Sequence, residues 1–532
     1  MNRNNSKNSV ILPLIAAFAL VAGILIGIIL PRKSDIPQHF GINQKTDKIN
    51  MVLKRIESDY VDTVDRSKLE ETAIPAMLRK LDPHSVYIPA KEQKRANESI
   101  HGNFEGIGIS FNMLNDTIIV ISTIPGGPSE KLGLQPGDKI IFVNDSLVAG
   151  KGISDEDVMG MLKGPRGTVV KVRILRDGYP ELLIFNITRD KIPIYSVDVS
   201  YMINKNTGYI KINNFAESTY EEFMNGLKEL KSKGMTKLII DLRGNSGGVM
   251  DASIQIANEF LKKGELIVYT KGRIQVRSEA RATGSGEFET GDLVMLIDEW
   301  SASASEILAG AIQDNDRGTI IGRRSFGKGL VQEPVYFPDG SGMRLTIARY
   351  YTPSGRSIQR PYSEGFEEYY NDLNIRIEKN EFETPDSIHF ADSLKFKTIG
   401  GRTVYGGGGI MPDKFVPLDT SGISAYYMKV RPLIYQFALT YTEKNRELLK
   451  KYLEADEFEK FLDKQGLLDQ FIRYASVNNV KPNAEDLKIS GSLIHTQLKA
   501  YIARNILDNK GFYPIWEEID STLKYAIEYL NK

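Results

Sequence analysis

Residues 293–308 read Leu293-Val-Met-Leu-Ile-Asp-Glu-Trp-Ser-Ala-Ser-Ala-Ser-Glu-Ile-Leu308, and this stretch decides how the middle of the chain folds. Five consecutive apolar residues, 293–297, predict a buried β-strand, and a cluster of small residues follows them. A helical pattern then begins, and its apolar face holds Ile307, Leu308, Ala311 and Ile312. The stretch therefore predicts a strand that leads through a small-residue turn into a helix.

Ser303 stands at the start of this helix and allows two interpretations. Ser303 and Glu306 have the S-x-x-E spacing of a capping box, in which the serine only caps the helix. The alternative is a functional serine, and the residues downstream favour it. Asp314 ends the helix, and Lys328 follows in a glycine-flanked loop, Ser325-Phe-Gly-Lys-Gly-Leu-Val-Gln332. For Asp314, helix-end capping explains the residue at least as well as support of a site.

The motifs S-A-S-A-S-E-I-L-A-G, from residue 301, and F-G-K-G-L-V-Q, from residue 326, resemble the C-terminal processing peptidases, also called tail-specific proteases. The resemblance covers residues 45–415. It implies a Ser–Lys dyad at Ser303 and Lys328, with Gln332 orienting the lysine. It also implies that the D-L-R-x-N-x-G-G loop, residues 241–248, forms one wall of the active site.

The chemistry of such a dyad sets a requirement on the lysine. At its ordinary pKa near 10.4 a lysine is protonated at neutral pH and cannot act as a base, so burial must lower the pKa of Lys328. An oxyanion hole is expected from the N–H of Ala304, at the helix start, together with that of Gly247 or Gly248. Ser303→Ala is expected to abolish hydrolysis, whereas Ser301→Ala and Ser305→Ala are expected to keep most of it.

Residues 101–190 resemble a PDZ domain. The segment Phe104-Glu-Gly-Ile-Gly-Ile-Ser-Phe111 is similar to the loop and strand with which such domains bind a terminal carboxylate and add a peptide as an extra strand. The predicted peptide-binding residues are Phe104, Gly106, Ile107, Gly108 and Ile109. A basic residue that couples the PDZ domain to the active site in the family corresponds to Lys163 or Arg166, although a solvated turn charge explains either one.

Composition excludes several other classes of protein. Lys+Arg and Asp+Glu both number 68, so no net charge recruits nucleic acid or an anionic surface. The chain has no cysteine, and its five histidines lack the H-E-x-x-H spacing, which argues against thiolate and zinc chemistry. We expect no cofactor and no metal. His84, in Leu81-Asp-Pro-His-Ser85, is explained better as part of a turn than as a catalytic residue.

Residues 10–30 are continuously apolar apart from glycine and Pro13, which is long enough to cross a bilayer core of about 30 Å. The run ends in Ile-Ile-Leu-Pro-Arg-Lys33 and offers no good signal-peptidase site, so an uncleaved anchor is predicted. Flanking positive charges are nearly balanced, and the family resemblance implies a catalytic part outside the cytoplasm, on the periplasmic or outer face of a bacterial inner membrane.

These observations predict a multidomain α/β protein. Its parts are a tail and membrane helix (1–33), a helical region (34–100), a β-rich PDZ domain with two helices (101–190), a crotonase-like α/β protease core (191–420) and a helical C-terminal region (421–532). The expected function is a serine endopeptidase that recognises apolar, unfolded C-terminal tails of proteins. Its helical regions could form a homo-oligomer. A non-catalytic PDZ scaffold or an envelope assembly protein is the alternative.

Overall fold

A computed structural model describes residues 47–532, which divide into two units, one ending at Thr72 and the other comprising residues 73–532. The first contains helix α2 (Lys48–Asp59) and the start of α3 (Arg66–Leu78). Among residues 47–532 no helix is long and apolar enough to cross a membrane. The predicted anchor, residues 10–30, lies outside the described residues and stays a prediction.

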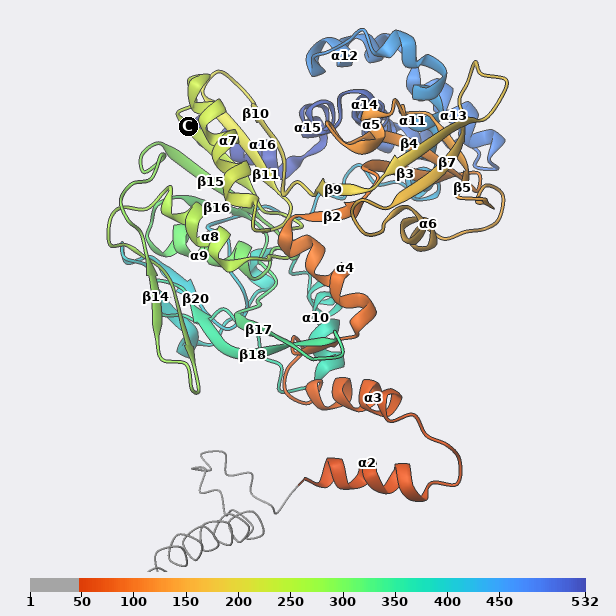
Figure 1. The fold of residues 1–532 in the computed structure, drawn as a ribbon. Coiled ribbons are helices and arrows are strands. Elements are labelled where there is room, and N and C mark those ends of the chain that lie inside the picture. Colours follow the sequence, from red (N-terminus) through yellow and green to blue (C-terminus); the bar gives the residue numbers. More distant parts are fainter. Residues whose placement is uncertain (1–46) are drawn as a thin grey trace, which may run out of the picture. The chain divides into compact units, whose positions relative to one another are not determined.

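The larger unit is built around a six-stranded sheet of order β10-β11-β12-β15-β16-β21 (Figure 1). Its strands are β10 (Val197–Met202), β11 (Thr207–Ile212), β12 (Lys237–Asp241), β15 (Asp292–Ile297), β16 (Thr319–Gly322) and β21 (Lys414–Phe415). Strands β11 to β21 are parallel, and β10 pairs with β11 in the antiparallel sense. The apolar residues 238–240 and 293–297 lie in central strands because a parallel sheet with both faces covered needs apolar side chains on each face.

Helices connect these parallel strands. They are α7 (Thr219–Ser232), α8 (Met250–Asn258) and α9 (Ala304–Asp314). Helix α9 follows β15 directly and is buried along its whole length. The main hydrophobic core lies between this sheet and these helices and includes Phe223, Phe260, Ile307 and Leu308.

A second, largely antiparallel sheet carries the lysine loop. It has the order β1-β18-β13-β14, with β17 paired to β18. Its strands are β1 (Val86–Ile88), β13 (Leu266–Gly272), β14 (Ser278–Arg281), β17 (Leu330–Tyr336) and β18 (Gly342–Tyr351). Lys328 lies two residues before β17, so the loop that holds it is fixed at one end by this sheet.

Residues 103–193 form the PDZ-like domain, whose main sheet has the order β3-β4-β5-β7-β8. The strands are β3 (Ile109–Leu114), β4 (Thr117–Thr123), β5 (Lys139–Val143), β7 (Val169–Leu175) and β8 (Leu183–Thr188); β6 (Ser146–Leu147) pairs with β5. Strand β2 (Asn103–Gly106) pairs with β9 (Asp190–Pro193), and the domain contains helices α5 (Pro128–Lys131) and α6 (Asp155–Leu162). Strand β3 is an edge strand, which leaves room for an added peptide strand.

Helical segments complete the unit. Helix α4 (Ala90–His101) precedes the PDZ-like domain, and α11 (Ala425–Leu449), α12 (Ala455–Leu462), α13 (Leu467–Val477), α14 (Ala484–Leu507), α15 (Asn509–Trp516) and α16 (Ser521–Leu530) form the C-terminal region. Residues 361–398, a charged and aromatic stretch, contain helix α10 (Phe366–Glu378). Arg376 of α10 is buried and donates to the carbonyl oxygens of Ser325 and Phe326, so this segment supports the lysine loop.

Candidate active site

Ser303 lies in the turn that follows β15, directly before helix α9, in a backbone conformation that side-chain-bearing residues rarely adopt. Its φ is 55° and its ψ is −112°. Holding a residue other than glycine there costs about 1–3 kcal/mol, and such strain concentrates at functional sites. Ser303 also takes part in a capping box with Glu306, so the two interpretations of this serine are compatible. Capping alone does not require a positive φ, because capping residues usually have extended backbone.

The wall opposite Ser303 is the glycine loop that follows β12, and buried polar groups fix it. Asn245 donates from its side chain to the Ile212 carbonyl oxygen (3.0 Å), and its own carbonyl oxygen accepts from the N–H of Ala302 (3.0 Å). Asp298 Oδ1 accepts from the N–H of Gly244 (2.9 Å). The glycine loop and the turn between β15 and α9, which contains Asp298 and Ala302, therefore form one hydrogen-bonded unit.

Ser301 and Ser305 belong to this unit and are fully buried. Ser301 Oγ donates to the Leu242 carbonyl oxygen, and Ser305 Oγ donates to that of Asn245, both at 2.9 Å. Removing either hydroxyl takes away a buried hydrogen bond worth about 1 kcal/mol. These two serines are therefore not the neutral controls for Ser303 that their sequence suggests.

Glu306 connects the serine to the lysine. Its side chain is buried, and Oε2 accepts from the backbone N–H groups of Ser303 and Lys328, both at 2.9 Å. Oε1 accepts from Ser325 Oγ (2.5 Å) and from the N–H of Gly327 (2.7 Å). Burial raises the pKa of Glu306 to about 6, although these four donors favour the charged form. At neutral pH the Glu306 carboxylate therefore holds the backbone N–H groups of both Ser303 and Lys328.

Tyr350, in β18, makes a second link between the same two residues. Its buried hydroxyl lies 3.2 Å from the carbonyl oxygen of Ser303 and also donates to that of Lys328. Sequence reasoning missed both Tyr350 and the part that Glu306 plays. For Glu306 the only signal was the S-x-x-E spacing, which indicates a cap and nothing more.

The surroundings of Lys328 lower its pKa, as a general base requires. Burial is the main cause, and the positive charge of Arg344 adds to it. Glu306 and Asp82 oppose the shift because their negative charges favour the protonated amine. Among the described residues, no hydrogen bond joins the amine of Lys328 to Ser303 or Gln332. Apo structures often show such contacts longer than they are during catalysis.

Gln332 is half-buried in β17, and its amide nitrogen donates to Thr346 Oγ1 (3.3 Å). Thr346 Oγ1 in turn donates to Asp82 Oδ1 (3.1 Å). Asp82 also accepts from the N–H groups of His84 and Ser85, both at 2.8 Å, which is the turn expected for this sequence. The turn lies close enough for Asp82 to affect the pKa of Lys328, a proximity that sequence reasoning missed.

His84 itself is held by the turn and by Tyr369, whose hydroxyl lies 2.9 Å from His84 Nε2. Burial and the nearby charge of Lys328 lower the pKa of His84 to about 3. A histidine with so low a pKa is neutral at physiological pH and is a weak base. The structure thus agrees with the structural interpretation of His84.

Two backbone N–H groups remain available for an oxyanion hole. The N–H of Gly247 donates to Asn245 Oδ1 (2.8 Å) and is therefore occupied. Within residues 47–532, the N–H groups of Ala304 and Gly248 donate to no acceptor. An added Cβ on Gly247 would lie 2.6 Å from Ser303 Cβ and 2.9 Å from the nitrogen of Ala304. The glycine loop thus lies against the serine, and Gly248 is the better candidate for the second donor.

Asp314, at the end of α9, serves packing and is no neighbour of the dyad. It forms a fully buried ion pair with Arg356 (2.8 Å) and accepts from Ser354 Oγ (2.6 Å). This agrees with a structural role at the helix end. It also fixes the turn that follows β18.

The predicted peptide-binding residues lie along β2, the turn that follows it and the start of β3. Gly108 has a φ of +73°, and the N–H groups of Ile107 and Gly108 donate to no acceptor within residues 47–532. The side chain of Ile107 is buried in the domain's own core, so only its backbone is placed to contact a peptide. Phe104 lies against Lys163, whose amine is 4.5 Å from its ring centre, while Ile109 and Phe111 are half-buried.

Lys163 and Arg166 differ in their surroundings. Lys163 Nζ lies 2.5 Å from Glu98 of α4, and its side chain is half-buried. Arg166 pairs with Asp190 (2.7 Å) inside the PDZ-like domain and is more exposed. Lys163 therefore connects the PDZ-like domain to α4, whereas the pair made by Arg166 stays within the domain.

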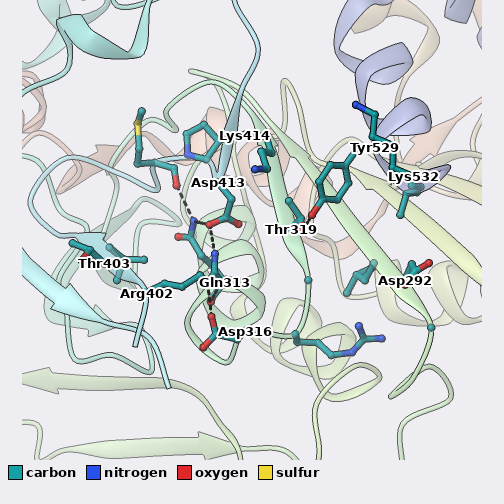
Figure 2. A pocket seen from close by; sticks show the side chains of 18 of the residues that line it. Asp292, Gln313, Asp316, Thr319, Arg402, Thr403, Asp413, Lys414, Tyr529 and Lys532 are labelled. Carbon is teal, nitrogen blue, oxygen red and sulfur yellow. Dashed lines mark hydrogen bonds and ion pairs between the residues drawn. The ribbon is translucent and has the colours of Figure 1, made fainter. Parts of the chain in front are cut away.

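A cavity of about 950 Å³ lies at the other end of the parallel sheet (Figure 2). Asp292 and Thr319 begin β15 and β16 and line it, whereas Ser303 follows the end of β15. Arg402 is already paired with Asp316 and Asp413. This cavity is therefore separate from the candidate active site. Among the residues that the structure describes, no cluster of three or more His, Asp or Glu side chains could hold a metal ion.

Glu306→Gln tests the connection between serine and lysine. Each carboxylate oxygen accepts two hydrogen bonds, so the amide nitrogen must face donors in either orientation. We expect a loss of about 1–3 kcal/mol in unfolding free energy and a drop in kcat of about 100-fold, because both reactive groups shift. Thermal unfolding and peptide hydrolysis measure the two effects. Full activity would show that the position of the dyad does not depend on this carboxylate.

Comparison with known proteins agrees with this geometry. Family models match at residues 206–367 (peptidase family S41), 98–175 (PDZ domain), 31–92 (activating protease CtpB N-terminal domain) and 426–508 (a family of unknown function, DUF8443). A carboxy-terminal-processing protease of Bartonella bacilliformis is 39% identical over 315 residues, which is 58% of this chain and 71% of the relative. The carboxy-terminal processing protease CtpB of Bacillus subtilis is 35% identical over 369 residues, 66% of this chain and 76% of the relative.

Among solved structures, the photosystem II D1 C-terminal processing protease is 29% identical and covers 58% of this chain and 89% of its own, with a TM-score of 0.34. The sequence relatives carry the assignment. The chain belongs to the carboxy-terminal processing proteases of peptidase family S41.

Proposed function

We propose that the protein is a serine endopeptidase in which Ser303 is the nucleophile and Lys328 is the general base. The observation that carries this proposal is the pairing of a strained serine at a helix start with a half-buried lysine of lowered pKa, both held by Glu306. A serine hydroxyl needs an adjacent base, and a neutral amine can supply one.

The steps follow from these positions. Lys328 takes the hydroxyl proton as Ser303 Oγ attacks the peptide carbonyl carbon, and the N–H groups of Ala304 and Gly248 stabilise the resulting oxyanion. The C–N bond breaks as the amine product receives the proton from Lys328, which leaves an acyl-enzyme. A water molecule then gives a proton to Lys328 as it attacks the ester carbonyl carbon. The C–O bond to Ser303 breaks, Ser303 Oγ receives the proton back from Lys328, and the acid product leaves. Gln332 donates to Thr346, which donates to Asp82, so in this proposal Gln332 stabilises the residues that surround Lys328.

The PDZ-like domain selects the substrate in this proposal. The free N–H groups of Ile107 and Gly108 bind the terminal carboxylate, and edge strand β3 pairs with the tail. Ile109 and Phe111 are half-buried and offer apolar contact to the last side chains. The preferred partners are unfolded proteins with apolar C-termini. An anchor at residues 10–30 would place the catalytic part at the outer face of the membrane.

Paired peptides test the recognition of tails. Two substrates identical except for a free or an amidated C-terminus should differ about tenfold or more in kcat/KM, because a charge-assisted hydrogen bond contributes about 1.5–3 kcal/mol. Gly108→Ala should reduce this ratio towards one, since a Cβ at its φ of +73° strains the binding turn and meets Ile192 at 3.0 Å.

Gly178→Ala is the matched control. Gly178 also has a positive φ, +88°, but has open space around it and lies between β7 and β8, at the edge of the sheet remote from β3. It should lose similar stability and keep the preference for a free carboxylate. Equal rates for the free and amidated peptides on the unaltered protein would reject tail recognition and leave a general endopeptidase.

A further inference from the structure

An ion pair joins the C-terminal helical region to the active-site loop. Arg243, the residue that starts the glycine loop after Leu242, donates from Nη1 to Asp520 Oδ1 (2.8 Å) and from Nη2 to Asp520 Oδ2 (2.6 Å). The two residues are 277 positions apart in the chain. Two parallel hydrogen bonds between a guanidinium and a carboxylate fix orientation as well as distance.

Asp520 is held rigidly. It caps helix α16 by accepting from the N–H of Leu523 (2.9 Å). Leu523, Ala526 and Leu530 of this helix are buried against strand residues of the central sheet, among them Ile239, Val294 and Leu296. The carboxylate therefore has a fixed position relative to β12 and β15, the strands that end at the two active-site loops.

Arg243 is clamped from the other side by the sheet. Its side chain donates to both oxygens of Asp241 (Nε at 3.0 and 3.1 Å, Nη2 at 2.6 Å), while Lys211 donates to the carbonyl oxygen of Arg243 and to Asp241 Oδ1. The side chains of these four residues are at most 18% exposed. Two positive and two negative charges balance within this site, and without Asp520 one positive charge would remain unpaired.

The glycine loop runs from Arg243 to Gly248, whose N–H is the candidate oxyanion donor. Gly244 is bonded to Asp298, and Gly247 lies against Ser303, so a shift at Arg243 passes along a short, constrained loop. We propose that Asp520 is a positioning residue for catalysis: the C-terminal region holds Arg243, and thereby the N–H of Gly248, at the oxyanion site. This inference rests on the proposed function of Ser303.

Asp520→Asn isolates this role because asparagine caps a helix as well as aspartate does but carries no charge. We expect kcat to fall about tenfold with KM unchanged, since small misplacements at a reacting centre lower the rate steeply. The Ki of a peptide boronic acid, whose tetrahedral adduct with Ser303 occupies the oxyanion site, should rise about as much. The Ki of the product peptide should stay the same.

Tyr529→Phe is the matched control on the same helix. It removes the hydrogen bond between Tyr529 and Thr319 (3.0 Å), at the other end of the sheet, and should lower only the melting temperature. Asp520→Ser, which also keeps a cap, replaces Asp520→Asn if that variant does not fold. If kcat and the boronic acid Ki stay unchanged in the Asp520 variant, Asp520 only stabilises the fold and the inference is overturned. Residual activity in Ser303→Ala, measured alongside, would instead reject the proposed function.

Discussion

Ser303→Ala is expected to abolish peptide hydrolysis, with a loss in kcat of about 10⁶-fold, the scale at which removal of a serine nucleophile acts in other serine proteases. No neighbouring hydroxyl can substitute, because Ser301 and Ser305 are buried and donate to carbonyl oxygens in the interior. The unfolding free energy should fall by only about 1 kcal/mol, the cost of a lost cap. Hydrolysis of a fluorogenic peptide and thermal unfolding measure the two quantities.

The control for this variant is Ser424→Ala. Ser424 caps helix α11 by accepting from the N–H of Tyr427 (3.1 Å), so the same substitution removes a capping hydroxyl in a region without proposed chemistry. It should show a comparable loss of stability and unchanged hydrolysis. Substantial activity in Ser303→Ala would reject Ser303 as the nucleophile. Loss of hydrolysis in both variants would mean that the loss concerns folding and not nucleophilic attack.

Lys328→Arg is expected to be as inactive as Lys328→Ala. Arginine keeps the positive charge but cannot give up its proton near neutral pH, so it cannot act as a base. Because burial and Arg344 lower the pKa of Lys328 from its ordinary value, the neutral amine becomes available as pH rises through that lowered pKa, and the rate should rise with it. Protonation of Glu306 below about pH 6 should steepen the decline at the acid end.

The measurement is a profile of kcat/KM against pH, from about pH 6 to 9, under conditions where chemistry limits the rate. A flat profile would argue against a titrating lysine. Partial activity in Lys328→Arg would indicate an electrostatic contact in place of proton transfer. The two results are independent, because the first concerns the unaltered protein and the second a variant.

Local sequence patterns were sufficient to predict the strands and helices around the dyad. The apolar run at 293–297 indicated a buried strand, and the small residues at 301–305 marked the turn into α9. The lysine loop was recognisable because its glycines and the residues around Lys328 form a short, continuous motif. Ser303 and Lys328 were thus accessible as candidates.

Contacts between residues far apart in sequence could not be predicted. Nothing near Asp520 indicates that it meets Arg243, since the ion pair depends on how α16 packs against the sheet. The side chain of Asn245 accepts from the N–H of Gly247, and this contact leaves Gly248 as the candidate oxyanion donor. The sequence alone did not distinguish the two glycines. Helix α10 lacks a clear apolar pattern because one of its two buried side chains is the charged Arg376, which turns inward to the lysine loop.

The double link between Ser303 and Lys328, through Glu306 and Tyr350, has a consequence for how the enzyme fails on heating. The lysine loop cannot detach while the start of α9 stays in place without breaking hydrogen bonds to both bridging residues. Partial melting of this region therefore removes nucleophile and base together. Each molecule in a heated sample should therefore have either full activity or none. No population should keep Ser303 in position while Lys328 is displaced.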